Sequence, residues 1–131
     1  MLIIREEQME VFRKYMCRQF ENRMVLHLSK YFPEECKALG EQRVRNTIRY
    51  GIERAKTYGI VIQNDVGRYT NLMFTFGRDF DKDPTLPWAG EVLNDEDLGW
   101  PTRRMDVLYE KAAKHLPDAV AIHGQNAEAQ P

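Results

Sequence analysis

The sequence is poor in the residues that build reactive centres and membrane spans. Its two cysteines, Cys17 and Cys36, have neither metal-ligand spacing nor histidines close by, so they indicate small buried thiols in a reducing compartment. A disulfide between them has no support in the sequence. The single serine, Ser29, belongs to no nucleophile-elbow motif, and no glycine-rich phosphate loop is present. No apolar run approaches the roughly 18 residues of a membrane span. We therefore expect no cofactor and no membrane association.

The length and composition are those of a globular domain. The chain has 131 residues, 43% of them hydrophobic and 30% charged, which suits one domain with a single core. The apolar stretch at residues 1–4 is too short for a signal peptide, so we expect a cytoplasmic protein.

Charge is nearly balanced overall and uneven along the chain. The net charge is −1, but residues 1–58 carry 12 Lys/Arg against 8 Asp/Glu, and residues 59–131 carry 7 against 12. This asymmetry favours pairing between the two halves, or else a surface with two differently charged faces.

Apolar residues recur at helical spacing, and prolines and glycines mark the breaks. The pattern predicts helices over residues 5–31, 33–39, 41–58, 65–76, 87–93 and 101–116. In the first of them we expect one buried arc, made of Met9, Phe12, Met16, Phe20, Met24, Leu28 and Tyr31. The run Ile60-Val61-Ile62 has no partner strand and is predicted to be an apolar connector inside the core.

These elements predict an all-α protein, a compact single-domain helical bundle of about four main helices plus short helical turns. The domain would span residues 1–116. Because Pro117 should stop the last helix and no apolar periodicity follows, residues 117–131 are predicted to form a flexible tail.

Three aspartates, Asp79, Asp81 and Asp83, have the spacing with which a calcium-binding loop begins. The loop would also need glycine at its sixth position and glutamate at its twelfth, where this chain has Pro84 and Gly90. The sequence therefore favours acids that cap turns or pair with the basic third helix, and we expect no metal.

His27 lies on the apolar arc of the first helix, as a general base in a cleft would. A core-edge histidine with ordinary hydrogen-bond partners would look the same, and this interpretation is the commoner one. His115 and His123 lie on other segments, so no catalytic constellation forms, and we predict that the protein is not an enzyme.

The third predicted helix is basic, with Arg45, Arg49 and Lys56 along one edge. A row of this kind suits phosphate binding. Glu41 and Glu53 interrupt it, however, so a solvated charged face is the preferred explanation and nucleic-acid binding is a further alternative.

The segment between Gly77 and Ala89 is rich in aromatic, proline and acidic residues. Tryptophan and tyrosine dominate interface hot spots, so this loop and its neighbours are candidates for binding another protein. The candidate partner-binding residues are Phe74, Phe80, Asp81, Asp83, Trp88 and Trp100. The alternative is a satellite core in which Phe80 and Trp88 fold back over the bundle, and the sequence leaves this open. The long, methionine-rich first helix also allows a homodimer.

A set of residues at structural positions carries a resemblance to a known group. The residues are Gly51-Ile52, Ala55, Tyr58-Gly59-Ile60, Tyr69, Leu72-Met73-Phe74, Gly77, Phe80-Asp81, Asp83-Pro84, Pro87-Trp88-Ala89, Leu108-Tyr109, Ala112 and His115-Leu116. Over about residues 4–116 the chain resembles small all-helical bacterial proteins associated with type VI secretion (contractile injection) gene clusters. The resemblance supplies no catalytic residues. It implies a cytoplasmic accessory role as an adaptor or chaperone for a secreted effector, with an immunity protein that neutralises a toxin as the alternative.

Overall fold

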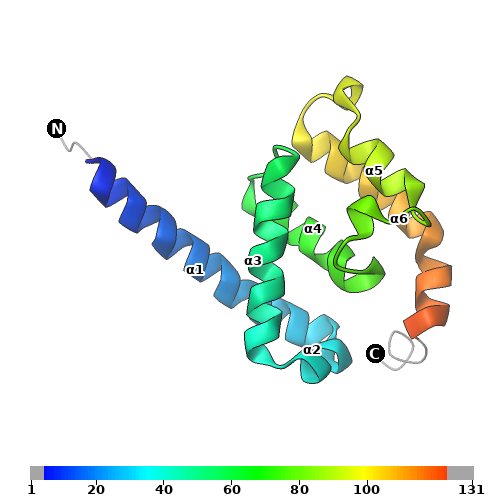
Figure 1. The fold of residues 1–131 in the computed structure, drawn as a ribbon, viewed down its shortest axis with the longest axis horizontal. Helices are drawn as coiled ribbons and strands as arrows, with labels where there is room; N and C mark the ends of the chain where they lie inside the picture. Colours follow the sequence, from blue (N-terminus) through cyan, green and yellow to red (C-terminus); the bar gives the residue numbers. More distant parts are fainter. Residues whose placement is uncertain (1–4, 124–131) are drawn as a thin grey trace. The chain divides into compact units, whose positions relative to one another are not determined.

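The computed structural model describes the backbone of residues 5–123 and the side chains of residues 5–116. Within these residues all regular elements are helices and there is no strand, which confirms the all-α prediction (Figure 1). The elements are α1 (Glu6–Tyr31), α2 (Pro33–Leu39), α3 (Glu41–Thr57), α4 (Gln63–Phe76), η1 (Phe80–Lys82), α5 (Pro87–Leu93), η2 (Glu96–Leu98) and α6 (Pro101–His123). A single bundle of four main helices stays a prediction, because the contacts divide the chain into two compact units, residues 1–48 and 49–131.

The first unit contains α1, α2 and the first half of α3. Its buried apolar side chains on α1 are Phe20, Met24 and Leu28, which lie four residues apart and so share one stripe of the helix. Glu21, beside this stripe, is also buried, and its carboxylate accepts a hydrogen bond of 3.0 Å from Arg45 on α3. The same arginine Nη1 donates to Asn22 at 2.9 Å. One arginine therefore fastens α3 to two adjacent residues of α1.

The predicted buried arc of α1 is only half correct. Phe12 and Tyr31 are exposed, and Met9 and Met16 are half-buried. Cys17 is exposed and Cys36 half-buried; both are free thiols, so the prediction of two buried thiols is wrong for Cys17. The reason is that periodicity predicts which side of a helix is apolar, but not how far along the helix a neighbour covers it.

The second unit contains the end of α3 and all later elements. Its interior is built on α4 and α6, where Tyr69, Met105 and Leu108 are fully buried. Gly51 of α3 allows a close approach to α4, because a Cβ atom at this position would lie 2.8 Å from the sulfur of Met73.

The last helix is longer than predicted. It does not end at Leu116 but continues through Pro117 to His123. The predicted tail, residues 117–131, therefore overlaps α6 as far as residue 123, and the rest of it lies outside the described residues.

The connector between α3 and α4 also differs from its prediction. Ile60 is fully buried, as expected, but Val61 and Ile62 are exposed. Gly59, at φ 78°, turns the chain sharply after α3, and Ile62 already occupies the N-cap position of α4. Because of this turn, Ile60 alone of the three side chains lies in the core.

Candidate protein interface

The structure separates the predicted partner-binding residues into two groups. Phe74, Phe80, Asp81 and Trp88 are buried, so the loop between α4 and α5 is a satellite core, the alternative that the sequence left open. Asp83 is half-buried and accepts hydrogen bonds from the backbone N–H and the hydroxyl of Thr85, at 2.9 and 2.7 Å. Trp100 alone of the six is largely exposed.

Trp88 is the centre of an aromatic contact in this satellite core. Its ring stacks on His115 of α6, with centroids 5.1 Å apart and an angle of 10° between the planes. Phe76 meets it edge-on at 5.3 Å. Helix α5 therefore packs through Trp88 against α6 and the end of α4.

Asp81 is the polar centre of the same region. Its carboxylate accepts hydrogen bonds from the guanidinium of Arg54 and, at 2.7 Å, from the hydroxyl of Tyr58. The hydroxyl of Tyr69 is buried and has no hydrogen-bond partner among the described residues. The expected pairing of loop acids with α3 is confirmed by this Arg54–Asp81 ion pair and by Asp79, which accepts from Tyr50. The three aspartates of the calcium-like spacing thus have separate partners.

Burial and these contacts act in opposite directions on the carboxylate. Burial raises the pKa of Asp81, but the hydrogen bonds from Tyr58 and Arg54 outweigh it, so the pKa lies below its ordinary value. Burial and the hydrogen bond to Asp81 raise the pKa of Tyr58 to about 12. Burial also raises the pKa of Tyr69. The cluster therefore consists of an ionised aspartate and neutral tyrosines at neutral pH.

This arrangement predicts a loss of stability at alkaline pH. An unfolded tyrosine ionises near pH 10, whereas Tyr58 in the folded chain keeps its proton until about pH 12. The unfolded state therefore binds fewer protons in this window, and the free energy of unfolding falls as pH rises through it. Circular dichroism melts from about pH 8 to about pH 11.5 check this. Tyr58→Phe should flatten the dependence. A slope for this variant equal to that of the native chain would contradict the assignment.

Two segments of the second unit that carry exposed apolar side chains approach each other. Trp100 is 81% exposed, Val61 68% and Ile62 58%. A Cβ atom on Gly59, which precedes Ile60 and Val61, would lie 4.0 Å from Cγ of Pro101, the residue after Trp100. We call Val61, Ile62 and Trp100 the tryptophan patch.

Hydrogen bonds at both ends hold the two segments of the patch together. The Nη2 of Arg104 donates to the carbonyl of Tyr58 at 2.7 Å, and its Nη1 donates to the carbonyl of Leu93 at 2.6 Å. The hydroxyl of Thr102 donates to Asp65 at 2.6 Å. Trp100 itself caps α6, since its carbonyl accepts from the N–H groups of the third and fourth following residues. The backbone of the patch is therefore fixed on both sides.

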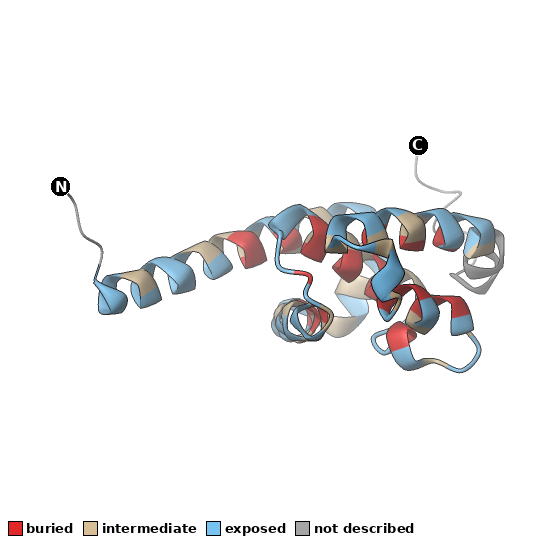
Figure 2. Ribbon diagram, turned by 90° about the horizontal axis from the view of Figure 1, so that it is seen from above, coloured by how far each residue is buried: buried red, intermediate tan, exposed pale blue. Residues whose placement is uncertain are grey.

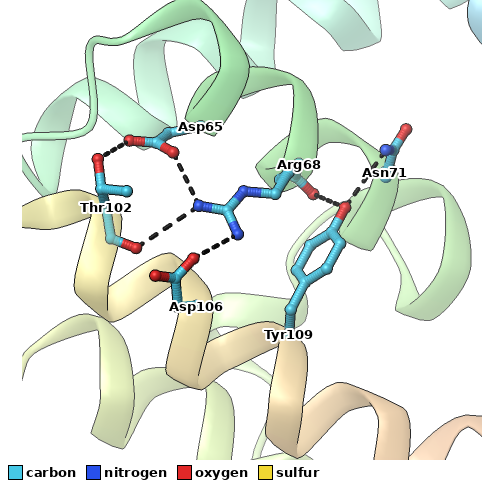
Figure 3. Close-up of polar contacts among 6 residues, drawn as sticks. All are labelled: Asp65, Arg68, Asn71, Thr102, Asp106 and Tyr109. Atoms are coloured by element: carbon cyan, nitrogen blue, oxygen red, sulfur yellow. Dashed lines mark hydrogen bonds and ion pairs between the residues drawn. The ribbon is translucent and has the colours of Figure 1, made fainter.

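A polar network between α4 and α6 continues this support (Figure 3). Arg68 donates to Asp65 and to Asp106, both at 2.8 Å, and so bridges the two helices. One turn further, the hydroxyl of Tyr109 donates to the backbone carbonyl of Arg68 at 3.1 Å. These hydrogen bonds fix the position of α4 relative to α6, the two helices next to the patch.

In the described part of the chain, His27 and the arginines of α3 make structural contacts. His27 is half-buried, with its ring 4.8 Å from that of Tyr31. On α3, Arg45, one of the residues considered for phosphate binding, pairs with Glu21, and Arg54 pairs with Asp81. Each serves the packing of its own unit.

The chain matches no protein-family model, no curated protein and no solved structure in the comparisons made. Within the described residues, none of the helices combines the length and the apolar character needed to cross a membrane.

Sequence reasoning missed two parts of the patch. Val61 and Ile62 look like core residues because they follow Ile60 in one apolar run, and only Gly59 signals that the chain turns there. Arg104 resembles a solvated helix residue, and nothing local in the sequence indicates the two carbonyls that it binds.

Proposed function

We propose that the protein is a non-enzymatic interaction module that binds another bacterial protein through the tryptophan patch. The observation that carries the proposal is the exposure of Trp100, at 81%, beside Val61 and Ile62. Following the resemblance, the partner would be a secretion effector or spike component, and the role that of a cytoplasmic adaptor or chaperone.

Trp100 presents a large apolar ring on a backbone that hydrogen bonds hold in place. A tryptophan offers a large apolar area with few rotatable bonds, so covering it releases much water at low entropic cost. Because Trp100 caps α6 and its neighbours are tied to α3 and α4, little order has to be created on binding. Preorganised aromatic anchors of this kind are typical hot spots.

The chemistry next to Trp100 indicates the nature of the partner. The preceding turn, η2, carries Asp95, Glu96 and Asp97, and the last two are exposed. An apolar centre with an acidic edge suits a partner that has a hydrophobic pocket with basic residues around it.

Binding to candidate effectors and spike proteins encoded by type VI secretion clusters tests the proposal. We expect Trp100→Ala to weaken binding by about 30-fold or more, since truncating a hot spot costs ~2 kcal/mol or more. Leu116→Ala is the control, because this side chain is also exposed on α6 but lies about 24 Å along the helix from Trp100. Unchanged affinity of Trp100→Ala for a partner that binds the native chain would remove the patch from the interface.

The acidic edge also favours a second candidate, an immunity protein that covers a basic toxin surface. Co-expression separates the two roles. An immunity protein restores the growth of cells that produce the toxin, and Asp97→Lys with Glu96→Lys should abolish the rescue. An adaptor binds its effector without restoring growth.

A further inference from the structure

The first turns of α1 carry large apolar side chains that are exposed in the described part of the chain. Within residues 5–19 no side chain is buried, as the pale blue and tan turns at the start of α1 show (Figure 2). Val11 is 67% exposed, Phe12 55% and Tyr15 58%. This is a second apolar surface, on a different unit from the tryptophan patch.

The apolar and the charged residues of this segment lie on different sides of the helix. At 100° per residue, its apolar and amide side chains fall on one half of the surface and its Glu, Lys and Arg side chains after Arg5 on the other. The apolar half consists of Gln8, Met9, Val11, Phe12, Tyr15, Met16 and Gln19. Its centre is turned by about 140° around the helix from that of Phe20, Met24 and Leu28, the stripe that packs in the first unit. The segment therefore has an apolar face of its own.

A helical segment of this kind needs a neighbour. Isolated helices of about 12–15 residues are marginal in water, and most helical stability in proteins comes from packing an apolar face. Val11, Phe12 and Tyr15 have lower helix propensity than alanine or leucine, so intrinsic preference does not supply the missing stability.

The charges on the segment favour one kind of neighbour. In its first part Glu6, Glu7 and Glu10 outnumber Arg5, whereas its second part carries only the basic residues Arg13, Lys14 and Arg18. A second copy of the same helix in the antiparallel direction sets the acidic part of each against the basic part of the other. A parallel copy sets like charges together. Charges beside an apolar seam select partner and direction in this way in coiled coils.

We propose that residues 5–19 of α1 pair antiparallel with the same segment of a second copy of the chain. Phe12, near the middle of the segment, lies close to the two-fold axis of this pair, with Met9 and Tyr15 on either side. The contact is isologous and closes on itself, so it yields a dimer.

Light scattering coupled to size exclusion tests the association. The native chain should have twice the 15.4 kDa mass of one chain, and Phe12→Ser with Tyr15→Ser should reduce it to a single chain. Leu26→Ser is the control, because Leu26 is exposed on the same helix outside the segment, and this variant should stay dimeric. A native chain that is monomeric would overturn the proposal and assign the face to a different protein. A double variant that stays dimeric would overturn it as well.

Cross-linking tests the direction. Arg5→Cys and Gln19→Cys place thiols at both ends of the apolar face, in a chain where Cys17→Ser removes the exposed native thiol. After oxidation and tryptic digestion, an antiparallel pair gives peptides that join position 5 of one chain to position 19 of the other. Peptides that join position 5 to position 5 would show a parallel pair and refute the charge argument.

Discussion

Replacing Asp81 with alanine is expected to lower the free energy of unfolding by about 3–5 kcal/mol, as removing one partner of a buried ion pair does. The side chain of Asp81 is fully buried, and that of Arg54 is 19% exposed. The variant leaves the guanidinium without its carboxylate and the hydroxyl of Tyr58 without its acceptor. The loss is a large fraction of the 5–15 kcal/mol that usually separates folded and unfolded states. Urea unfolding, followed by circular dichroism, measures it.

Two further variants separate the buried pair from a general effect of removing an acid. Asp83→Ala removes an acid two residues away whose carboxylate accepts exposed hydrogen bonds from Thr85, and should cost far less. Arg54→Met with Asp81→Leu removes both charges and should recover much of the loss. A loss for Asp81→Ala no larger than that of Asp83→Ala would show that the ion pair does not stabilise the fold.

Trp88→Ala is expected to destabilise the protein by a similar amount, about 3–5 kcal/mol, which is typical of truncating a large buried aromatic residue. The ring lies between His115 and Phe76, so its removal opens a cavity between α4, α5 and α6. Thermal melts compared with the native chain measure the effect.

The matched control is the other tryptophan of the chain. Trp100→Ala should change stability by less than about 0.5 kcal/mol, because its side chain is mostly in water. Trp88→Ala therefore tests packing and Trp100→Ala tests binding. Equal stability of the two variants would contradict the satellite core.

The ends of most helices were predictable from a few residues. Pro33 and Pro87 begin α2 and α5, and Pro101 begins α6. Gly40 and Gly77 follow α2 and α4 with φ of 82° and 123°, a region that favours glycine. These signals are local, because they depend on the backbone freedom of single residues. Pro117 is the exception, since α6 continues past it.

The surface was harder to predict than the helices. Phe80, Trp88 and Trp100 have the same character in the sequence, and only the tertiary contacts bury the first two and expose the third. The same holds for α1, whose apolar residues recur along the whole helix but are buried only from Phe20 onward. Which side chain meets water depends on elements far away along the chain, and this information is not local.

Two hydrogen bonds of the fold depend on Arg104, a residue that is synthesised after the helices it contacts. Leu93 is the last residue of α5 and Tyr58 follows the last residue of α3, so this one guanidinium supplies donors to the carboxyl-terminal ends of two earlier helices. A nascent chain that has emerged from the ribosome only as far as α5 lacks both donors. The carbonyls of Tyr58 and Leu93 therefore receive these two donors only once α6 has left the ribosome.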